Sequence, residues 1–244
     1  MSAPELIRHS SPDDLAAVVA AQLVQRLVAV QAEGREPQIG LTGGSIAVTI
    51  HEALVPASRG TDLDWSRVVV WWGDERYVPD GDPERNARQA REALLDHVDV
   101  DPAKVHEMPT SEAIPDIDAA AASYAEELRE HGGDAFDVLM LGIGPDGHCA
   151  SLFPGFPQLD VTGQATVAVT GSPKPPPERI SLTFEALNRS REVWFVAAGD
   201  GKAEAVRKAT AEDGDVHATP ARGVSGQQRT LWFLDAGSAS QLPR

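Results

Sequence analysis

The sequence predicts an α/β fold: a single domain with a mostly parallel, Rossmann-like sheet and helices on both faces. Segments with helical periodicity alternate with short apolar segments along the 244 residues, which is typical of parallel sheets with crossover helices. Residues 138–141 are apolar at every position, as expected of a strand covered on both faces. The one strongly loop-like interior stretch, 154–163, is too short for a flexible linker. Residues 1–244 should therefore form one domain.

The first helix is predicted from its cap and its periodicity. Ser11 is followed three residues later by Asp14, which resembles a capping box, and Pro12 suits the first helical turn. Apolar residues then recur on one helical face from Leu15 to Val30. Because such a face is stable only when it is covered, we expect this helix to pack on the sheet.

The remaining elements follow in alternation, and each strand ends in a polar loop. Strands are expected at residues 39–41, 68–72, 138–141, 166–170, 180–183, 193–197 and 231–234. Helices are expected at residues 46–54, 86–98, 119–130 and 202–209. The segment 84–98 carries many charges, and we interpret it as an exposed helical face.

Composition and charge exclude several classes of protein. The formal net charge is -16, from 21 Lys+Arg and 37 Asp+Glu, whereas nonspecific binding to nucleic acids or anionic membranes needs a positive surface. Cys149 is the only cysteine, so an intramolecular disulfide is impossible. The N-terminus lacks the apolar core of a signal peptide, and we expect no apolar run able to span a bilayer. These features predict a cytoplasmic protein without nucleic-acid or membrane partners. A monomer or a small homo-oligomer is expected.

The most informative segment is 136–155, FDVLMLGIGPDGHCASLFPG. Asp146 and His148 follow its buried strand, and ligands of parallel sheets gather at the carboxyl ends of strands. The glycines also match the G-x-G-x-x-G dinucleotide pattern, but Pro145 and the later Phe-Pro-Gly leave no room for the long helix of that motif. A hydrogen-bonded loop histidine is the simpler alternative. The nearby Asp146 favours a chemical role for His148.

A second motif, Thr42-Gly43-Gly44-Ser45, lies between a predicted strand and a predicted helix. Its backbone N–H groups and the helix N-terminus could bind an anion such as phosphate. The equally plausible alternative is an ordinary turn in which Thr42 or Ser45 caps the helix. No lysine follows the glycines, which excludes a nucleotide P-loop.

A third motif, Asp74-Glu75-Arg76, ends the predicted strand 68–72. Arg76 could bind phosphate or carboxylate with two parallel hydrogen bonds, while Asp74 and Glu75 could orient it or act as bases. The alternative is a solvated turn with a local ion pair. The position at the expected ligand edge favours a functional role.

The fourth motif is the proline-rich arm 172–181, SPKPPPERIS. A stiff extended arm can present Lys174 and Arg179 with little entropy left to lose on binding, although such a segment alone would more often be a linker. Lys202, at the start of the last predicted helix, is a further candidate phosphate contact. A plain surface lysine is an equally good interpretation of Lys202.

Together, these motifs resemble 6-phosphogluconolactonase and occur in the order typical of that family. The most specific parts are the segment GHCASLFPG and the proline-rich arm. The TGGS and Asp-Glu motifs are shared with the similar glucosamine-6-phosphate isomerase family. One departure is Arg85-Asn86, where the family usually has Ser-Asn, and it leaves a substrate contact at position 85 open.

The resemblance implies hydrolysis of 6-phospho-D-glucono-1,5-lactone to 6-phosphogluconate. Neutral imidazole has a reference pKa of about 6.5, so His148 is the expected general base, and Asp146 would orient it or its water. By resemblance Arg76 and Asp74 belong to the site. The expected phosphate ligands are Gly43, Gly44, Ser45, Lys174, Arg179 and Lys202. No cofactor and no metal are expected, since the seven histidines are scattered, and Cys149 is expected to pack rather than to act as a nucleophile.

Two alternative functions are compatible with parts of the sequence. In an amino-sugar-phosphate isomerase or deaminase, Asp74 would move a proton on carbon. Members of that family have a segment similar to AFNEPG after their Gly-His. This chain has ASLFPG at 150–155 and lacks the acidic residue. A non-catalytic sugar-phosphate-binding protein would be expected to lose the base, and His148 is present.

Overall fold

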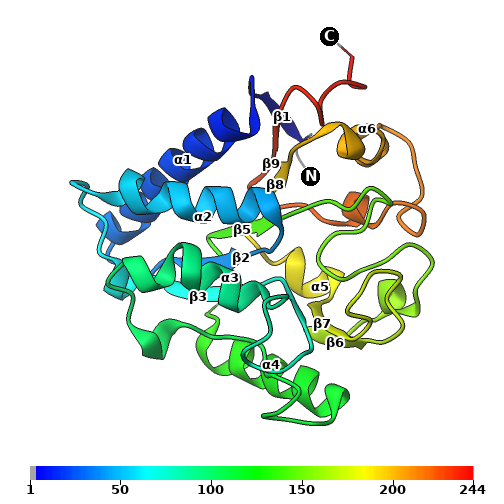
Figure 1. The fold of residues 1–244 in the computed structure, drawn as a ribbon, viewed down its shortest axis with the longest axis horizontal. Helices are drawn as coiled ribbons and strands as arrows, with labels where there is room; N and C mark the ends of the chain where they lie inside the picture. Colours follow the sequence, from blue (N-terminus) through cyan, green and yellow to red (C-terminus); the bar gives the residue numbers. More distant parts are fainter. Residues whose placement is uncertain (1–3, 134, 244) are drawn as a thin grey trace.

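The main sheet is parallel and central. The computed structural model describes residues 4–133 and 135–243, and among these six strands form the sheet in the order β1-β9-β8-β5-β2-β3 (Figure 1). All five strand pairings are parallel. The strands are β1 (Glu5–Arg8), β2 (Gln38–Leu41), β3 (Val69–Trp72), β5 (Val138–Leu141), β8 (Glu192–Ala197) and β9 (Arg229–Leu234).

The strand order reverses between β2 and β5. The chain runs from β2 outward to β3, then returns to the other side of β2 and continues through β5, β8 and β9. At such a switch point the loops after the two central strands diverge and leave a crevice at their carboxyl ends. The TGGS motif follows β2 and the Asp146-His148 segment follows β5, so both motifs lie at this crevice.

Helices flank the main sheet, as predicted. Figure 1 shows α1, α2 and α3 side by side, while α4 lies at the other end of the molecule beside the smaller sheet. The helices are α1 (Pro12–Ala32), α2 (Ser45–Ser58), α3 (Asn86–Ala93), α4 (Ile117–His131), α5 (Phe184–Leu187) and α6 (Ala203–Thr210). Short 3-10 turns are η1 (Trp65–Arg67), η2 (Leu95–His97), η3 (Pro102–Lys104), η4 (Pro157–Asp160), η5 (Asp200–Lys202) and η6 (Pro220–Gly223).

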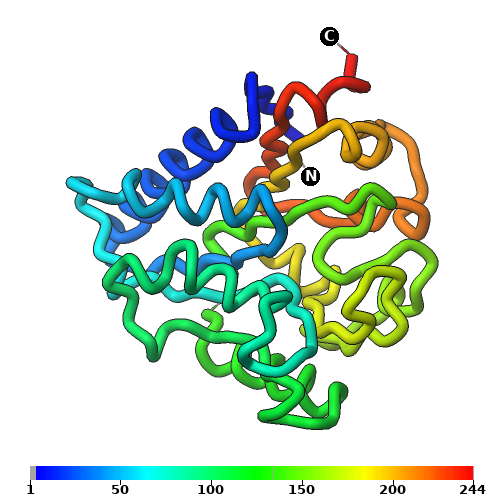
Figure 2. Tube along the Cα trace, viewed as in Figure 1, coloured from blue at the N-terminus to red at the C-terminus, as the bar shows by residue number. Residues whose placement is uncertain are grey.

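A second, antiparallel sheet contains one strand that the sequence did not predict. Its order is β4 (Asp74–Arg76), β7 (Arg179–Leu182) and β6 (Thr166–Val169). The interpretation of residues 74–76 as a polar loop was therefore wrong. Asp74 pairs with Ser181 and Arg76 with Arg179, and a partner strand so distant in sequence leaves no local signal. The strand β1, which pairs with β9 near the chain ends (Figure 2), was also missed.

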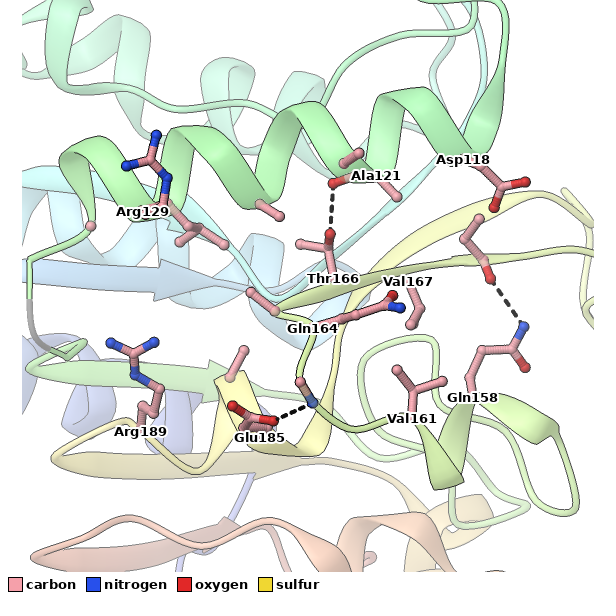
Figure 3. Close-up of a pocket in the computed structure, with 18 of the residues that line it drawn as sticks. Asp118, Ala121, Arg129, Gln158, Val161, Gln164, Thr166, Val167, Glu185 and Arg189 are labelled. Carbon is pink, nitrogen blue, oxygen red and sulfur yellow. Dashed lines mark hydrogen bonds between the residues drawn. The ribbon is translucent and has the colours of Figure 1, made fainter.

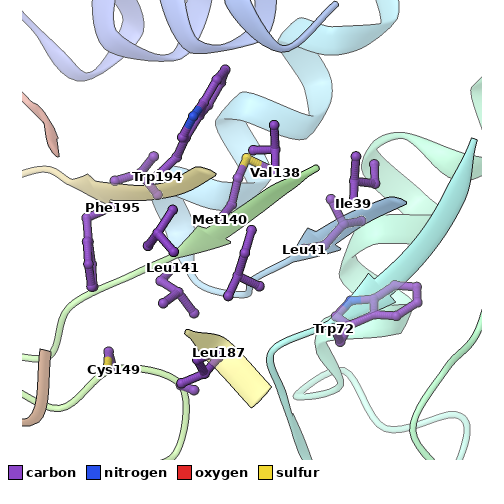
Figure 4. Packing of buried hydrophobic residues seen from close by; sticks show 14 of the residues in the cluster. Ile39, Leu41, Trp72, Val138, Met140, Leu141, Cys149, Leu187, Trp194 and Phe195 are labelled. Atoms are coloured by element: carbon purple, nitrogen blue, oxygen red, sulfur yellow. The ribbon is translucent and has the colours of Figure 1, made fainter. Parts of the chain in front are cut away.

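The hydrophobic core joins the two sheets. All four residues of β5 are buried, which confirms the prediction from its uninterrupted apolar run. Figure 4 shows Leu41, Leu141 and Phe195 of the main sheet in the same cluster as Cys149 and Leu187. The cluster also contains residues of β6 and β7, so packing of the smaller sheet is continuous with that of the main sheet.

The first helix begins as predicted. Ser11 is the N-cap, and its hydroxyl accepts a hydrogen bond from Asp14 N at 3.1 Å. The Asp14 carboxylate bonds Ser10 rather than Ser11. By length and composition α1 could cross a membrane, so the expectation that no apolar run could do so was wrong. Half of its most apolar 18-residue stretch is buried within the protein. A helix that packs in a protein core has the same length and composition.

Candidate active site

One cavity at the carboxyl edge of the main sheet brings the four sequence motifs together. Its volume is about 240 Å³. The loops after β2, β5 and β8 and the strand β4 contribute to its lining, as does the proline-rich arm. Of the predicted site residues, those that line it are Gly43, Gly44, Ser45, Asp74, Arg76, His148, Lys174, Arg179 and Lys202. Asp146 lies next to the cavity and contacts it through His148.

His148 and Asp146 form a hydrogen-bonded pair. His148 Nδ1 lies 2.6 Å from Asp146 Oδ1. A carboxylate can only accept, so Nδ1 carries the proton and Nε2 is left as the basic nitrogen. Partial burial raises the pKa of Asp146, but the hydrogen bond from His148 and the charges of His148 and Lys174 outweigh it and hold that pKa well below its usual range. A side chain at Gly144 would overlap both partners.

Two lysines lie near this pair. Lys174 Nζ is 3.6 Å from Asp146 Oδ1 and 3.4 Å from His148 Nδ1. Lys202 Nζ donates a hydrogen bond to Ile143 O at 2.7 Å. Burial and the nearby charge of Lys174 lower the pKa of Lys202. The cavity thus concentrates positive charge in a strongly acidic chain.

The N-terminus of α2 faces the same cavity. Gly44 is the N-cap with φ of 97°, and no side chain accepts a hydrogen bond from the first turn. Such a φ favours glycine. The alternative in which Thr42 or Ser45 caps the helix is therefore not what the structure has. Uncapped N–H groups at the positive end of a helix are suited to bind an anion.

Arg76 is held by Asn86, which was not among the predicted site residues. Arg76 Nη1 donates to Asn86 Oδ1 at 2.7 Å and to Glu84 O at 2.6 Å. Asn86 Nδ2 donates to Asp74 O at 2.9 Å. The Nε of Arg76 is buried without a hydrogen-bond partner. The hydrogen bond between Asn86 and Arg76 could not be predicted from the sequence, because it depends on how α3 packs against β4.

Glu75 caps α3 instead of facing the cavity. Its carboxylate accepts hydrogen bonds from the backbone N–H groups of Arg76, Asn86 and Ala87 at 2.7–2.8 Å. Burial raises the pKa of Glu75 to about 7, although the Arg85 charge and the three N–H donors act in the opposite direction. Glu75 therefore fixes the backbone of Arg76 and the start of α3 without lining the cavity itself.

Arg85 is buried and does not line the cavity. Its side chain is 1% exposed; Nη2 donates to Met108 O at 3.0 Å and lies 3.9 Å from Glu75 Oε2. The interpretation of 84–98 as a plain exposed face was wrong at its N-terminal end. The α-helix ends at Ala93 and is therefore shorter than predicted. A 3-10 turn, Leu95–His97, follows it. The charge pattern of the segment could not show that Arg85 is buried beside the Glu75 carboxylate.

Asp74 is buried and its orientation is set by Ser151. The Ser151 hydroxyl donates to Asp74 Oδ2 at 2.6 Å, and Ser151 itself is fully buried. Ser151 N in turn donates to Ser181 Oγ at 3.1 Å. Cys149 is also fully buried, and burial followed by the charge of Asp74 raises the pKa of its thiol. A thiol in this state is a poor nucleophile.

Arg179 bonds mainly to the proline-rich arm. It is 4% exposed; Nε donates to Pro176 O at 3.2 Å, and Nη2 donates to Lys174 O and Pro175 O at 3.3 Å each. Its guanidinium lies 5.7 Å from the centre of the Phe153 ring, within cation–π range.

A larger cavity, about 910 Å³, opens between α4, α5 and β6 (Figure 3). It contains none of the predicted site residues. Figure 3 shows hydrogen bonds from two of its side chains to backbone carbonyls: Thr166 Oγ1 donates to Ala121 O, and Gln158 Nε2 donates to Ala168 O. Among residues 4–133 and 135–243, no three His, Cys, Asp or Glu side chains are grouped to hold a metal ion. The larger cavity is lined by Asp118, Arg129, Glu185 and Arg189, whereas the predicted site residues converge in the smaller cavity.

The fold and the smaller cavity define a class of protein: an α/β protein with a His-Asp pair, a helix N-terminus and several cations at the switch point of its sheet. A family model described as glucosamine-6-phosphate isomerases/6-phosphogluconolactonase matches residues 10–232. The chain belongs to this family.

Its relatives include named 6-phosphogluconolactonases. One from Streptomyces coelicolor is 47% identical over 250 residues, covering 99% of this chain and 95% of the relative. One from Mycobacterium tuberculosis is 44% identical over 238 residues, covering 95% of each. The solved structure of 6-phosphogluconolactonase from Trypanosoma cruzi matches with a TM-score of 0.88 at 26% identity, covering 100% of this chain and 99% of that one.

Proposed function

We propose that this protein hydrolyses 6-phospho-D-glucono-1,5-lactone to 6-phosphogluconate. The observation that carries the proposal is the His148–Asp146 pair, whose Nδ1–Oδ1 hydrogen bond of 2.6 Å leaves Nε2 as the basic nitrogen beside a cation-lined cavity. The names of the relatives that cover nearly the whole chain support the same reaction.

The reaction proceeds by attack of water on the lactone carbonyl. His148 Nε2 accepts a proton from the water as its oxygen bonds C1, and the carbonyl oxygen becomes anionic. Arg76, with a buried Nε that has no partner, donates to this oxyanion. When the intermediate collapses, the bond from C1 to the ring oxygen breaks, and the imidazolium returns the proton to that oxygen. Asp146 keeps the imidazole in the required tautomer and stabilises its charged form.

The phosphate binds at the opposite end of the substrate. The N–H groups at Gly43, Gly44 and Ser45 donate to its oxygens at the positive end of α2. Lys174 and Lys202 supply the balancing charge, and both line the same cavity. Local cations can create a favourable field in a cleft although the whole chain is acidic. The substrate's remote phosphate thereby positions the lactone carbonyl at His148.

The first test compares two candidate substrates. Purified protein should hydrolyse the phosphorylated lactone well above its spontaneous rate, with no added metal or nicotinamide cofactor, and should release no ammonia from glucosamine 6-phosphate. Ammonia release would favour the isomerase alternative. Phosphate-dependent binding of both compounds without turnover would favour a non-catalytic binding protein.

The second test separates the two candidate bases. His148→Ala should lower kcat by about 10²- to 10⁴-fold, the usual contribution of a general base, and should leave the fold and phosphate binding intact. Asp74→Asn keeps the shape and removes the basicity, and it should retain more activity than His148→Ala. Near-wild-type turnover by His148→Ala, with an unchanged pH profile, would contradict the assignment of His148.

A further inference from the structure

In the proline-rich arm, residues 172–181, hydrogen bonds of Ser172 to Lys174 and Pro177 close the loop. Ser172 N donates to Pro177 O at 2.9 Å. The Ser172 hydroxyl accepts from Lys174 N at 3.2 Å and donates to Lys174 O at 3.0 Å. No helix or strand is assigned between β6 and β7, so the shape of the arm depends on side-chain contacts.

Arg179 supplies those contacts from inside the loop. As the first residue of β7, it is paired with Arg76 on one side and Val169 on the other, so the smaller sheet fixes its backbone. Its guanidinium donates to three successive carbonyls of the arm, at residues 174, 175 and 176. A planar fork of donors can do this, whereas a single ammonium cannot.

These bonds use most of the hydrogen-bonding capacity of Arg179. A guanidinium has five N–H donors, and Nε and Nη2 are engaged by the arm. The side chain is also nearly fully buried. By contrast, Lys174 Nζ reaches the His148–Asp146 pair, at 3.4 Å from His148 Nδ1 and 3.6 Å from Asp146 Oδ1.

We propose that Arg179 is a positioning residue whose effect on anion binding passes through Lys174. It shapes the arm so that the Lys174 ammonium, which stands beside the His148–Asp146 pair, faces the cavity in which the substrate's phosphate binds. This role takes the place of the direct phosphate contact that the sequence predicted for Arg179. The inference rests on the proposed function for the identity of the anion, and on the geometry of the arm for everything else.

A double-mutant cycle tests the proposal. The variants are Lys174→Met, Arg179→Met and the pair, with Arg129→Met on the exposed face of α4 as the control; the Arg129 side chain is 67% exposed. The readouts are KM and kcat for the phosphorylated lactone and the competitive inhibition constant of inorganic phosphate. Each single variant should raise KM and that constant about 10- to 100-fold, the usual effect of losing a charged hydrogen bond.

The double variant should resemble Lys174→Met alone, with less than about a twofold further change, since non-additivity marks residues that act through one another. If the two single losses multiply instead, Arg179 contacts the phosphate independently and the proposal is wrong. The control should behave as wild type. Wild-type turnover of the lactone is measured in the same assay, so a failure of the proposed function is seen separately from a failure of this inference.

Arg179→Lys, which keeps the buried positive charge, gives a second test of whether Arg179 binds phosphate directly or positions the arm. If Arg179 binds phosphate as a cation, lysine should preserve most of the affinity. We expect Arg179→Lys to lose nearly as much phosphate affinity as Arg179→Met, because one ammonium cannot bond three carbonyls of the arm. Full retention of phosphate affinity by Arg179→Lys would overturn the proposal. Circular dichroism of each variant verifies that the fold is kept.

Discussion

Gly43 leaves room for the side chain that holds Arg76. A Cβ at position 43 would overlap Oδ1 of Asn86, the atom that accepts from Arg76 Nη1. The requirement for glycine here comes from close approach of a side chain, in addition to any approach of the ligand. At the residue scale, therefore, the position of Arg76 depends on the absence of a Cβ at position 43, in the preceding motif of the chain.

Gly43→Ala should lower kcat/KM about 10-fold or more, because displacing Asn86 removes a charged hydrogen bond from Arg76. The measurement is lactone hydrolysis under steady-state conditions. Gly81→Ala is the matched control, since a Cβ at position 81 would meet nothing within 4 Å. Wild-type kinetics for Gly43→Ala would mean that Arg76 is not held through Asn86.

At the scale of elements, Tyr124 links α4 to the main sheet. Its hydroxyl accepts from Trp72 N at 3.0 Å and lies 3.3 Å from the carbonyl oxygens of Trp72 and His106. Trp72 is the last residue of β3, next to the turn that leads into Asp74. The bond therefore anchors the end of the strand that carries part of the cavity wall.

Tyr124→Phe should lower the free energy of unfolding by about 1–3 kcal/mol, because it leaves the buried N–H of Trp72 without a partner. Urea denaturation measures the change. Tyr77→Phe is the comparison, because the Tyr77 hydroxyl bonds a single carbonyl, Ile114 O, and its removal should cost less. Equal stability of Tyr124→Phe and wild type would show that α4 is held to the sheet by packing alone.

At the scale of the whole molecule, His51 ties stability to pH. It is 1% exposed in α2, and neither ring nitrogen has a hydrogen-bond partner. Burial lowers its pKa from 6.5 to about 4. The unfolded chain therefore takes up a proton at higher pH than the folded protein does. The stability that depends on neutral His51 is complete above pH 6.5 and is lost as the pH falls from 6.5 toward 4.

The full loss amounts to about 3 kcal/mol at 1.36 kcal/mol per pKa unit. His51→Leu removes it, so the fall in unfolding free energy between about pH 7.5 and 5 should shrink by about 2 kcal/mol in that variant. Urea titrations at both pH values measure this. An unchanged pH dependence in His51→Leu would contradict a buried neutral imidazole.

The sequence by itself determined the fold class and the motifs of the site. Apolar runs such as 138–141 and the periodicity of residues 15–30 are local consequences of burial, so they can be read without knowing what covers them. The polar residues that end these runs lie at one edge of a parallel sheet, and this placed His148, Asp146 and Gly43 in one region, while the family resemblance of the proline-rich arm added Lys174.

Only the tertiary structure decided how those residues are held. Asp74–Arg76 became a strand because β7, about a hundred residues later, supplies its backbone partners. Arg85 and Glu75 are buried because each compensates the other. Arg179 turned toward the arm because three carbonyls converge on it. These outcomes depend on pairings between segments far apart in the chain, and such pairings follow from three-dimensional packing, which a local pattern of residues does not encode.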